Sequence, residues 1–230
     1  CNTFTGTGTV SASGFTSANG SGSGGRCAVV YNAAAQSALA KPRVTFSVGP
    51  GFRASGVDLM GILYFPDGAI LDATWLPHTG QVEWASAPAS WTAGTMNVYG
   101  NIRLTNEGFR LTVLTNLNIS GAGAQLELGG NVSGWSGWYP LNYGSRWPST
   151  DTTNGPTLTV GGDLNVTNGG QLVIFAGLTN TTTTNYSALV DVAGTIYLDT
   201  NSWICPNSNP TNGGSPLFRT RNLNVDNSNC

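Results

Sequence analysis

Residues 158–175 read LTVGGDLNVTNGGQLVIF, and this stretch decides the fold. Three short runs in it, 158–160, 164–167 and 171–175, are rich in β-branched and aliphatic residues, and the first two alternate them with polar ones. Alternation with a period of two is typical of β-strands that bury one face. A few Gly, Asp and Asn residues separate the runs, which leaves no room for a helix between them. The stretch therefore predicts three strands in quick succession, as in one coil of a repeating β-structure.

The same pattern recurs through the second half of the chain. We predict strands at 109–114, 117–120, 125–128, 157–160, 164–167, 171–175, 189–192, 195–198, 202–205 and 223–226. The turns between these runs do not resemble the two-residue Asn-Gly or Asp-Gly connections of β-hairpins. We therefore predict an all-β fold, a right-handed parallel β-helix with loop insertions, in which each coil hydrogen-bonds to its neighbours. A β-sandwich is the alternative.

Alternation also predicts which side chains face the interior of such a solenoid. The expected inward residues are aliphatic and would stack in columns: Leu158, Val160, Leu164, Val166, Leu172, Ile174, Val190, Val192, Ile196, Leu198, Leu223 and Val225. Thr, Asn and Asp occupy the positions between them, where polar side chains can form ladders along the outside.

Composition narrows the class of function. Charged residues make up 9% of the 230 residues, against roughly 25% in an average protein. The formal net charge is -2, and no basic stripe is present that would bind a phosphate backbone, so nucleic acid is not an expected partner. The longest apolar runs fall far short of the ~20 residues of a membrane-spanning helix, so we expect no transmembrane segment.

The N-terminal region carries a resemblance to a known family. Residues 4–14 read FTGTGTVSASG, and residues 21–31 read SGSGGRCAVVY. These segments resemble the Gly-rich coils of large bacterial cell-surface β-helix proteins of the adhesin and autotransporter kind, and residues 209–215 are similar to a segment of such repeats. The resemblance implies a β-helix at the bacterial cell surface or outside the cell. It departs at Cys27, where the family pattern has Ile, and it implies no catalytic residue.

We interpret residues 1–230 as a single β-helix domain. Residues 41–100 are richer in aromatic residues and Pro, and we expect irregular coils or a side elaboration there. A Trp-rich insertion is expected at about 133–156. Its aromatic residues are the best candidates for a contact surface, because they could stack on sugar rings or pack against another subunit: Trp135, Trp138, Tyr139, Tyr143 and Trp147.

Cysteine spacing adds a prediction about the ends of the solenoid. Cys1 and Cys27 lie 26 residues apart, and Cys205 and Cys230 lie 25 apart, close to the ~20–30 residues of one coil. Strands in neighbouring coils are ~4.8 Å apart, which suits a disulfide. We therefore predict the disulfides Cys1–Cys27 and Cys205–Cys230. Free thiols, lipid attachment to Cys1 and an intermolecular Cys1–Cys230 bond remain as alternatives.

Enzymatic chemistry finds little support in the sequence. Asp67 and Asp72, with Arg53 nearby, are the nearest approach to the paired carboxylates of a glycosidase, but Pro66-Asp67-Gly68 is a turn signature. His78, the only histidine, is assigned to a loop. No C-x-x-C pair is present, so we expect no metal site, and we expect no cofactor.

These observations predict a non-enzymatic, extracellular structural or adhesive protein. An uncapped β-helix exposes unpaired strand edges at both ends, so we expect self-association into an end-to-end filament, or contact with neighbouring repeats of a larger surface protein. The alternative function is a carbohydrate-binding module that holds a glycan through the Trp-rich insertion. A polysaccharide-active β-helix enzyme is a third, weaker hypothesis.

Overall fold

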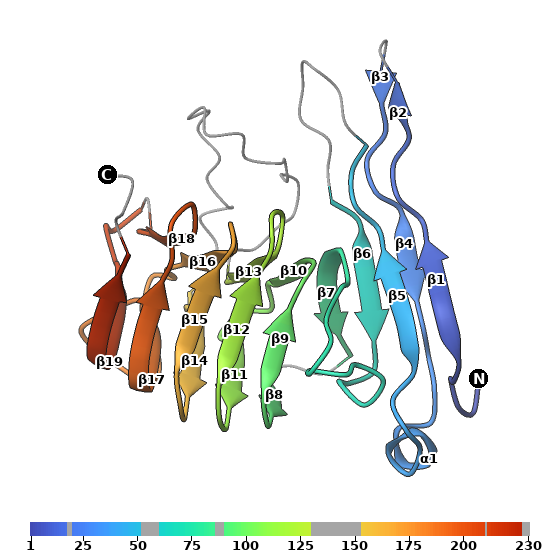
Figure 1. Cartoon of the computed structure of the whole chain (residues 1–230), viewed down its shortest axis with the longest axis horizontal. Coiled ribbons are helices and arrows are strands. Elements are labelled where there is room, and N and C mark those ends of the chain that lie inside the picture. The colour runs from blue at the N-terminus through green and yellow to red at the C-terminus, as the bar shows by residue number, and fades with distance from the viewer. Residues whose placement is uncertain (18–19, 52–59, 86–89, 130–152, 210, 227–230) are drawn as a thin grey trace.

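The computed structural model describes residues 1–17, 20–51, 60–85, 90–129, 153–209 and 211–226. The fold is all-β, and its large sheets are built from parallel strands. Figure 1 shows the strands lying side by side along the longest axis of the molecule, with β1 near one end and β19 near the other. Parallel pairing does not fit a β-sandwich, whose sheets are antiparallel.

One large sheet has seven strands, all in parallel pairs. In spatial order they are β18 (Trp203–Asn207), β16 (Gln171–Phe175), β13 (Gln125–Leu128), β10 (Asn101–Leu104), β7 (Gly80–Trp84), β6 (Ile62–Phe65) and β4 (Arg26–Ala28).

The other large sheet has eight strands, seven of them in its main path, and also consists of parallel pairs. These strands are β8 (Ser90–Ala93), β11 (Arg110–Val113), β14 (Thr157–Val160), β17 (Ala188–Leu198), β15 (Leu164–Thr167), β12 (Leu117–Ser120) and β9 (Met96–Val98), with β19 (Pro216–Val225) paired to β17. The first half of β17 pairs with β14 and its second half with β15, so one long strand joins two rows of short ones.

Regular pairing runs through both sheets. From β7 to β14 each strand pairs with the strand three places later in the chain, as β10 does with β13 and β13 with β16. Asn101 is thereby opposite Gln125, and Gln125 opposite Gln171. Residues far apart in sequence become direct neighbours in register, as the repeated pattern predicts.

The N-terminal region adds smaller elements. Strands β1 (Thr7–Ser11) and β5 (Arg43–Ser47) form a two-stranded parallel sheet, and β2 (Thr16–Ser17) and β3 (Gly20–Ser21) form an antiparallel hairpin. Helix α1 (Ala33–Ser37) is a single short turn. The side chain of Asn32 caps it by accepting a hydrogen bond from the backbone N–H of Ala35 at 3.1 Å.

Sequence periodicity located most strands of the second half correctly. The strands predicted at 117–120, 125–128, 157–160, 164–167 and 171–175 have the same bounds in the structure. Those predicted at 189–192 and 195–198 are one continuous strand, β17, and the strand predicted at 223–226 is the end of the longer β19. Residues 41–100, expected to be irregular, contain β5 to β9, and β6 to β9 pair into the two large sheets.

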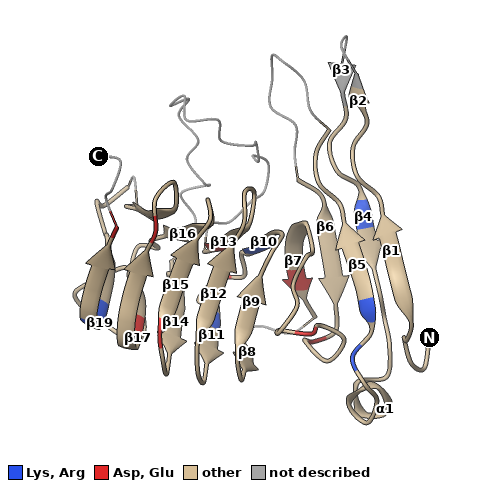
Figure 2. Cartoon of the chain, viewed as in Figure 1, with Lys and Arg blue, Asp and Glu red and all other residues tan. Residues whose placement is uncertain are grey.

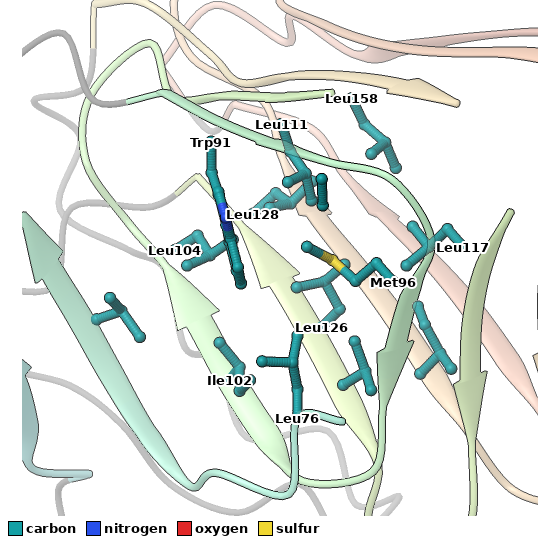
Figure 3. Close-up of a cluster of buried hydrophobic side chains, with 14 of the residues drawn as sticks. Leu76, Trp91, Met96, Ile102, Leu104, Leu111, Leu117, Leu126, Leu128 and Leu158 are labelled. Carbon is teal, nitrogen blue, oxygen red and sulfur yellow. The ribbon is translucent and has the colours of Figure 1, made fainter. Parts of the chain in front are cut away.

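The core lies between the two large sheets. Figure 3 shows side chains such as Leu104 and Leu126 of the seven-stranded sheet gathered in one apolar interior with Leu111 and Leu117 of the eight-stranded sheet. Most of the predicted inward residues belong to this core, from Leu158 through Ile196, and Leu198 is partly buried against it.

Two predicted inward residues are not buried. Leu223 is 65% exposed and Val225 51% exposed. Both lie on β19, which pairs with β17 on one side, and no described strand covers its other side. Their burial was wrongly predicted because alternation specifies the face of a strand and does not specify whether another strand follows.

A ladder of asparagine side chains runs along the outside of the eight-stranded sheet. Nδ2 of Asn165 donates to Oδ1 of Asn118 at 2.8 Å, and Nδ2 of Asn118 donates to Oδ1 of Asn97 at 2.7 Å. Nδ2 of Asn97 in turn donates to the carbonyl oxygen of Thr74 at 3.0 Å. The three amides occupy matching positions in β15, β12 and β9, so the ladder reinforces the register of the backbone.

A pair of Leu→Ala variants tests how burial depends on the neighbouring strand. Leu164 and Leu223 share one column through Ile196, but Leu164 is fully buried. We expect Leu164→Ala to lower the free energy of unfolding by about 2–5 kcal/mol, because it leaves a cavity. Leu223→Ala removes a side chain that is mostly in water and should change it by about 0.5 kcal/mol or less. Chemical denaturation monitored by circular dichroism compares them, and equal losses would contradict the open end at β19.

Candidate interaction surfaces at the two ends of the sheets

The end of the molecule formed by β18 and β19 exposes apolar side chains. β18 is the last strand of the seven-stranded sheet, and β19 lies beyond β17 in the other sheet. Trp203 on β18 is 47% exposed, and Leu223 and Val225 on β19 are exposed as well. We call this surface, defined by β18 and β19, the C-terminal end.

Comparison along one column shows why these side chains are exposed. Leu117, Leu164 and Ile196 occupy successive positions and are each at most 2% exposed, whereas Leu223 in the next position is 65% exposed. Each of the first three is covered by the strand that follows it. Leu223 therefore has the chemistry of a core residue without the strand that would bury it.

The opposite end is formed by β1 and β4. Each pairs on one side, β1 with β5 and β4 with β6, and neither has a described partner on its other side. Val10 on β1 is 37% exposed, although its partner Phe46 is buried. We call this surface the N-terminal end. As at the C-terminal end, an apolar residue in line with buried core residues lies on an edge strand, and no further described strand buries it.

Charge does little to protect these edges. Figure 2 shows charged residues scattered singly over the strands, and β1 and β18 contain none. Native proteins commonly use charged residues and proline to stop edge strands from pairing. The features of this kind at the C-terminal end are Pro206 on β18 and Pro216, Arg219 and Arg221 on β19. The ends are thus partly protected and still offer backbone groups for strand pairing.

The two aspartates considered for catalysis are engaged in turns. Oδ1 of Asp67 accepts hydrogen bonds from the Tyr31 hydroxyl at 2.6 Å and from the backbone N–H of Ala69 at 2.8 Å. Burial, together with Asp67, raises the pKa of Tyr31. Asp72 accepts from the backbone and hydroxyl of Thr74, and Arg53 lies outside the described residues. The turn interpretation therefore explains the carboxylates of Asp67 and Asp72.

His78 lies outside the regular strands, as expected, but its side chain is buried, with 3% exposed. Its Nδ1 accepts a hydrogen bond from the backbone N–H of Phe46 at 3.2 Å. Desolvation by burial lowers the pKa of His78 to about 4, and the charge of Asp72 opposes this shift. His78 is therefore a neutral structural acceptor at neutral pH.

The predicted disulfide Cys1–Cys27 is not formed, and Cys1, Cys27 and Cys205 are all free thiols. The amino group of Cys1 donates to the carbonyl of Val30 at 2.9 Å, so Cys1 lies beside a residue three places beyond Cys27. Three residues of extended chain span ~10 Å, too far for a disulfide. Cys27 is also buried in the interior, while Cys1 is exposed. Thr7 lies opposite Arg43 and Arg26 opposite Ile62, so a coil at this end is longer than the separation of Cys1 and Cys27.

Two other predicted groups lie outside the described residues. Cys230, the proposed partner of Cys205, is one of them. Cys205 itself is half-buried on β18, where burial raises its pKa. The aromatic contact candidates are the other group: Trp135, Trp138, Tyr139, Tyr143 and Trp147. Their role as an interaction surface stays a prediction.

A buried ion pair on the seven-stranded sheet was not predicted from the sequence. Nε of Arg103 lies 3.1 Å from Oε2 of Glu127 without hydrogen-bond alignment, and both side chains are almost fully buried. Nε2 of Gln125 donates to the same carboxylate oxygen at 3.3 Å. The signal was present in the sequence, because Asn101-Ile-Arg-Leu and Gln125-Leu-Glu-Leu place opposite charges at equivalent positions.

Comparisons with protein-family models, curated proteins and solved structures find no match for this chain. Within the part of the chain that the structure describes, no helix is long and apolar enough to cross a membrane. In that same part, no three His, Cys, Asp or Glu residues are grouped so that they could hold a metal ion. The exposed strand edges are therefore the most distinctive candidate site among the described residues.

Thiol labelling tests the free cysteines. We expect a thiol reagent to modify Cys1 rapidly in the native protein, because it is exposed. Cys27 should react only after denaturation, because burial shields its thiol and raises its pKa. Peptide mapping by mass spectrometry identifies the labelled residues, and a Cys1→Ser variant should lose the rapid reaction. A crosslinked peptide containing Cys1 and Cys27 would contradict the structure.

Proposed function

We propose that the chain is a right-handed parallel β-helix that acts as a non-enzymatic structural or adhesive module. The pairing of each strand with the strand three places later supports the β-helix, because successive strands then return to the same sheet. A right-handed path follows the general preference of crossovers between parallel strands. Within β9 to β17, each coil of the proposed β-helix contributes one strand to each of three rows of paired strands.

The exposed ends carry the functional proposal. Leu223, Val225 and Trp203 at the C-terminal end and Val10 at the N-terminal end are apolar, exposed and placed on edge strands. An edge strand with these side chains is a template for a further strand. The partner is a second copy that stacks end to end into a filament, or a neighbouring repeat of a larger surface protein. In both cases the contact is heterologous and can propagate in one direction.

The described polar groups favour this role over catalysis. Asp67 and Asp72 are held by turn hydrogen bonds, and Arg103 and Glu127 are buried against each other. Each of these groups has a structural use, so none needs a substrate to explain its position. The proposed location at the bacterial cell surface rests on the resemblance of residues 4–31 to surface repeat proteins.

Charge placed on the C-terminal end tests the assembly. The double variant Leu223→Lys/Val225→Lys puts two ammonium groups where a further strand would have to pack. We expect the unmodified protein to form elongated assemblies as its concentration rises. The double variant should need at least about tenfold higher concentration, equivalent to ~1.4 kcal/mol or more. Size-exclusion chromatography with light scattering and negative-stain microscopy measure this.

The matched control is Leu114→Lys. Leu114 is 60% exposed, as apolar as Leu223, and lies just after β11, in the interior of the strand order. This variant should assemble like the unmodified protein. Equal loss of assembly in both variants would point to general surface hydrophobicity and contradict end-to-end stacking. A protein that stays monomeric and binds immobilised polysaccharide would replace this proposal with the carbohydrate-binding alternative.

A further inference from the structure

The two-stranded sheet β1–β5 is joined to the eight-stranded sheet through a short irregular segment, residues 75–79. On one side, the segment pairs with β5 through an isolated bridge between Ser47 and Thr79. On the other side, it pairs with β9 through an isolated bridge between Leu76 and Val98. Regular strand pairing is interrupted here among the described residues, whereas β4, β6 and β7 continue without interruption in the other large sheet.

We call residues 75–79 and their two bridges the joint between the sheets, and the side chain of His78 adds a further hydrogen bond to it. The bridge supplies two backbone hydrogen bonds, from Thr79 N–H to the Phe46 carbonyl at 2.9 Å and from Val48 N–H to the Thr79 carbonyl at 2.8 Å. The N–H of Phe46 donates to Nδ1 of His78 instead of to a carbonyl. The imidazole therefore takes the place that a backbone acceptor has elsewhere in a parallel ladder.

Protonation would reverse the role of that nitrogen. Nδ1 accepts a hydrogen bond only while it carries no proton, and in the imidazolium both ring nitrogens are donors. The buried N–H of Phe46 would then face another N–H and lose its acceptor, which is costly inside a protein. The charge would also be buried beside aromatic rings, since the His78 ring centroid lies 5.4 Å from that of Phe46 and 6.4 Å from that of Trp75.

The charged groups around the joint have partners of their own. Asp72 favours the protonated form of His78, and its carboxylate also pairs with Arg43 at 3.5 Å. Arg43 in addition lies over the Trp75 ring, 5.2 Å from its centroid. The ammonium group of Lys41 donates to the carbonyls of Gly68 and Ala69 in the same loop as Asp72. Asp72 reduces the cost of charging His78 but does not cancel the cost of burial, since the pKa stays below its usual value.

We propose that His78 makes this joint acid-sensitive, so that β1 and β5 separate from residues 75–79 when the ring is protonated, while the strands from β9 onward stay paired. The inference stands on the hydrogen bond from Phe46 and does not depend on the proposed function. It gives one end of the molecule a histidine-dependent response to pH, and His78 is the only histidine of the chain.

The pH range follows from the two states of the ring. Exposed in the opened joint, His78 has a pKa of about 6.5; in the closed joint its pKa is about 4. The open form therefore binds more protons between these values, and the joint is fully stable above pH 6.5 and weakens as the pH falls toward 4. Opening should increase by up to about tenfold per pH unit within this range, and its total rise approaches roughly 300-fold well below pH 4.

Hydrogen exchange tests the proposal. Exchange is measured for the amides that bridge the joint, those of Phe46, Val48 and Thr79, at pH 6.5 and 4.5 and is corrected for the intrinsic rate at each pH. We expect the opening equilibrium at these amides to rise about 40-fold, and that of β12 and β15 to stay within about threefold. Unchanged protection of the bridging amides would overturn the proposal, and so would an equal loss of protection in β12 and β15.

The matched variant is His78→Asn. The asparagine Oδ1 can accept from the Phe46 N–H in the place of Nδ1, and it does not titrate. We expect protection of the bridging amides in this variant to be nearly independent of pH. An acid loss equal to that of the unmodified protein would assign the effect to the carboxylates, such as Asp72, and overturn the role of His78.

A second measurement does not require the variant to fold. Because the chain has one histidine, its imidazole proton resonance can be followed in the unmodified protein without assignment ambiguity. We expect the ring of the closed form to titrate well below 6.5. The Asp72→Asn variant should lower the pKa of the closed-form ring further, because Asp72 favours the charged ring. A closed-form ring that titrates near 6.5 would contradict the proposal, as would a higher closed-form pKa in Asp72→Asn.

Discussion

The parallel hydrogen-bond ladder between strands three places apart is the interaction on which the rest of this structure depends. It fixes which residues meet: Leu117 lies over Leu164 and Asn118 over Asn165. Because the register is constant, one sequence pattern produces both the apolar interior and the polar ladders outside. Each strand is buried by its neighbours on both sides, so stability along the array arises mainly from contacts between adjacent strands.

This dependence on neighbours explains the asymmetry between the middle and the ends. A Leu in the middle of the array and a Leu on β19 have the same alternation and the same column, yet one is buried and the other is in water. The middle has its partners within the chain. The strands at the ends carry the same backbone N–H and C=O groups as interior strands, but on one side these groups have no described partner strand. The surfaces of the two ends are therefore the strongest candidates for interaction.

The sequence was sufficient to predict the strands where polar and apolar residues alternate strictly, as at 157–160 and 164–167. It was insufficient where register or tertiary contact decided the outcome. The Cys1–Cys27 disulfide was wrong because the coils at that end are longer than the spacing of the two cysteines, as the pairing of Thr7 with Arg43 shows. His78 was assigned to a loop without burial, since its partner, the N–H of Phe46, is a backbone group 32 residues away. The Arg103–Glu127 pair required knowing which strands are neighbours.

The asparagine ladder has a direction. Asn165, Asn118 and Asn97 each donate through Nδ2 toward the preceding strand, ending on the carbonyl of Thr74. Their amide dipoles therefore align head to tail and polarise one another. Rotating one amide by 180° would place two donors or two acceptors face to face at its neighbour. The three side chains consequently behave as one cooperative unit, whose orientation is set by a single backbone carbonyl at its far end.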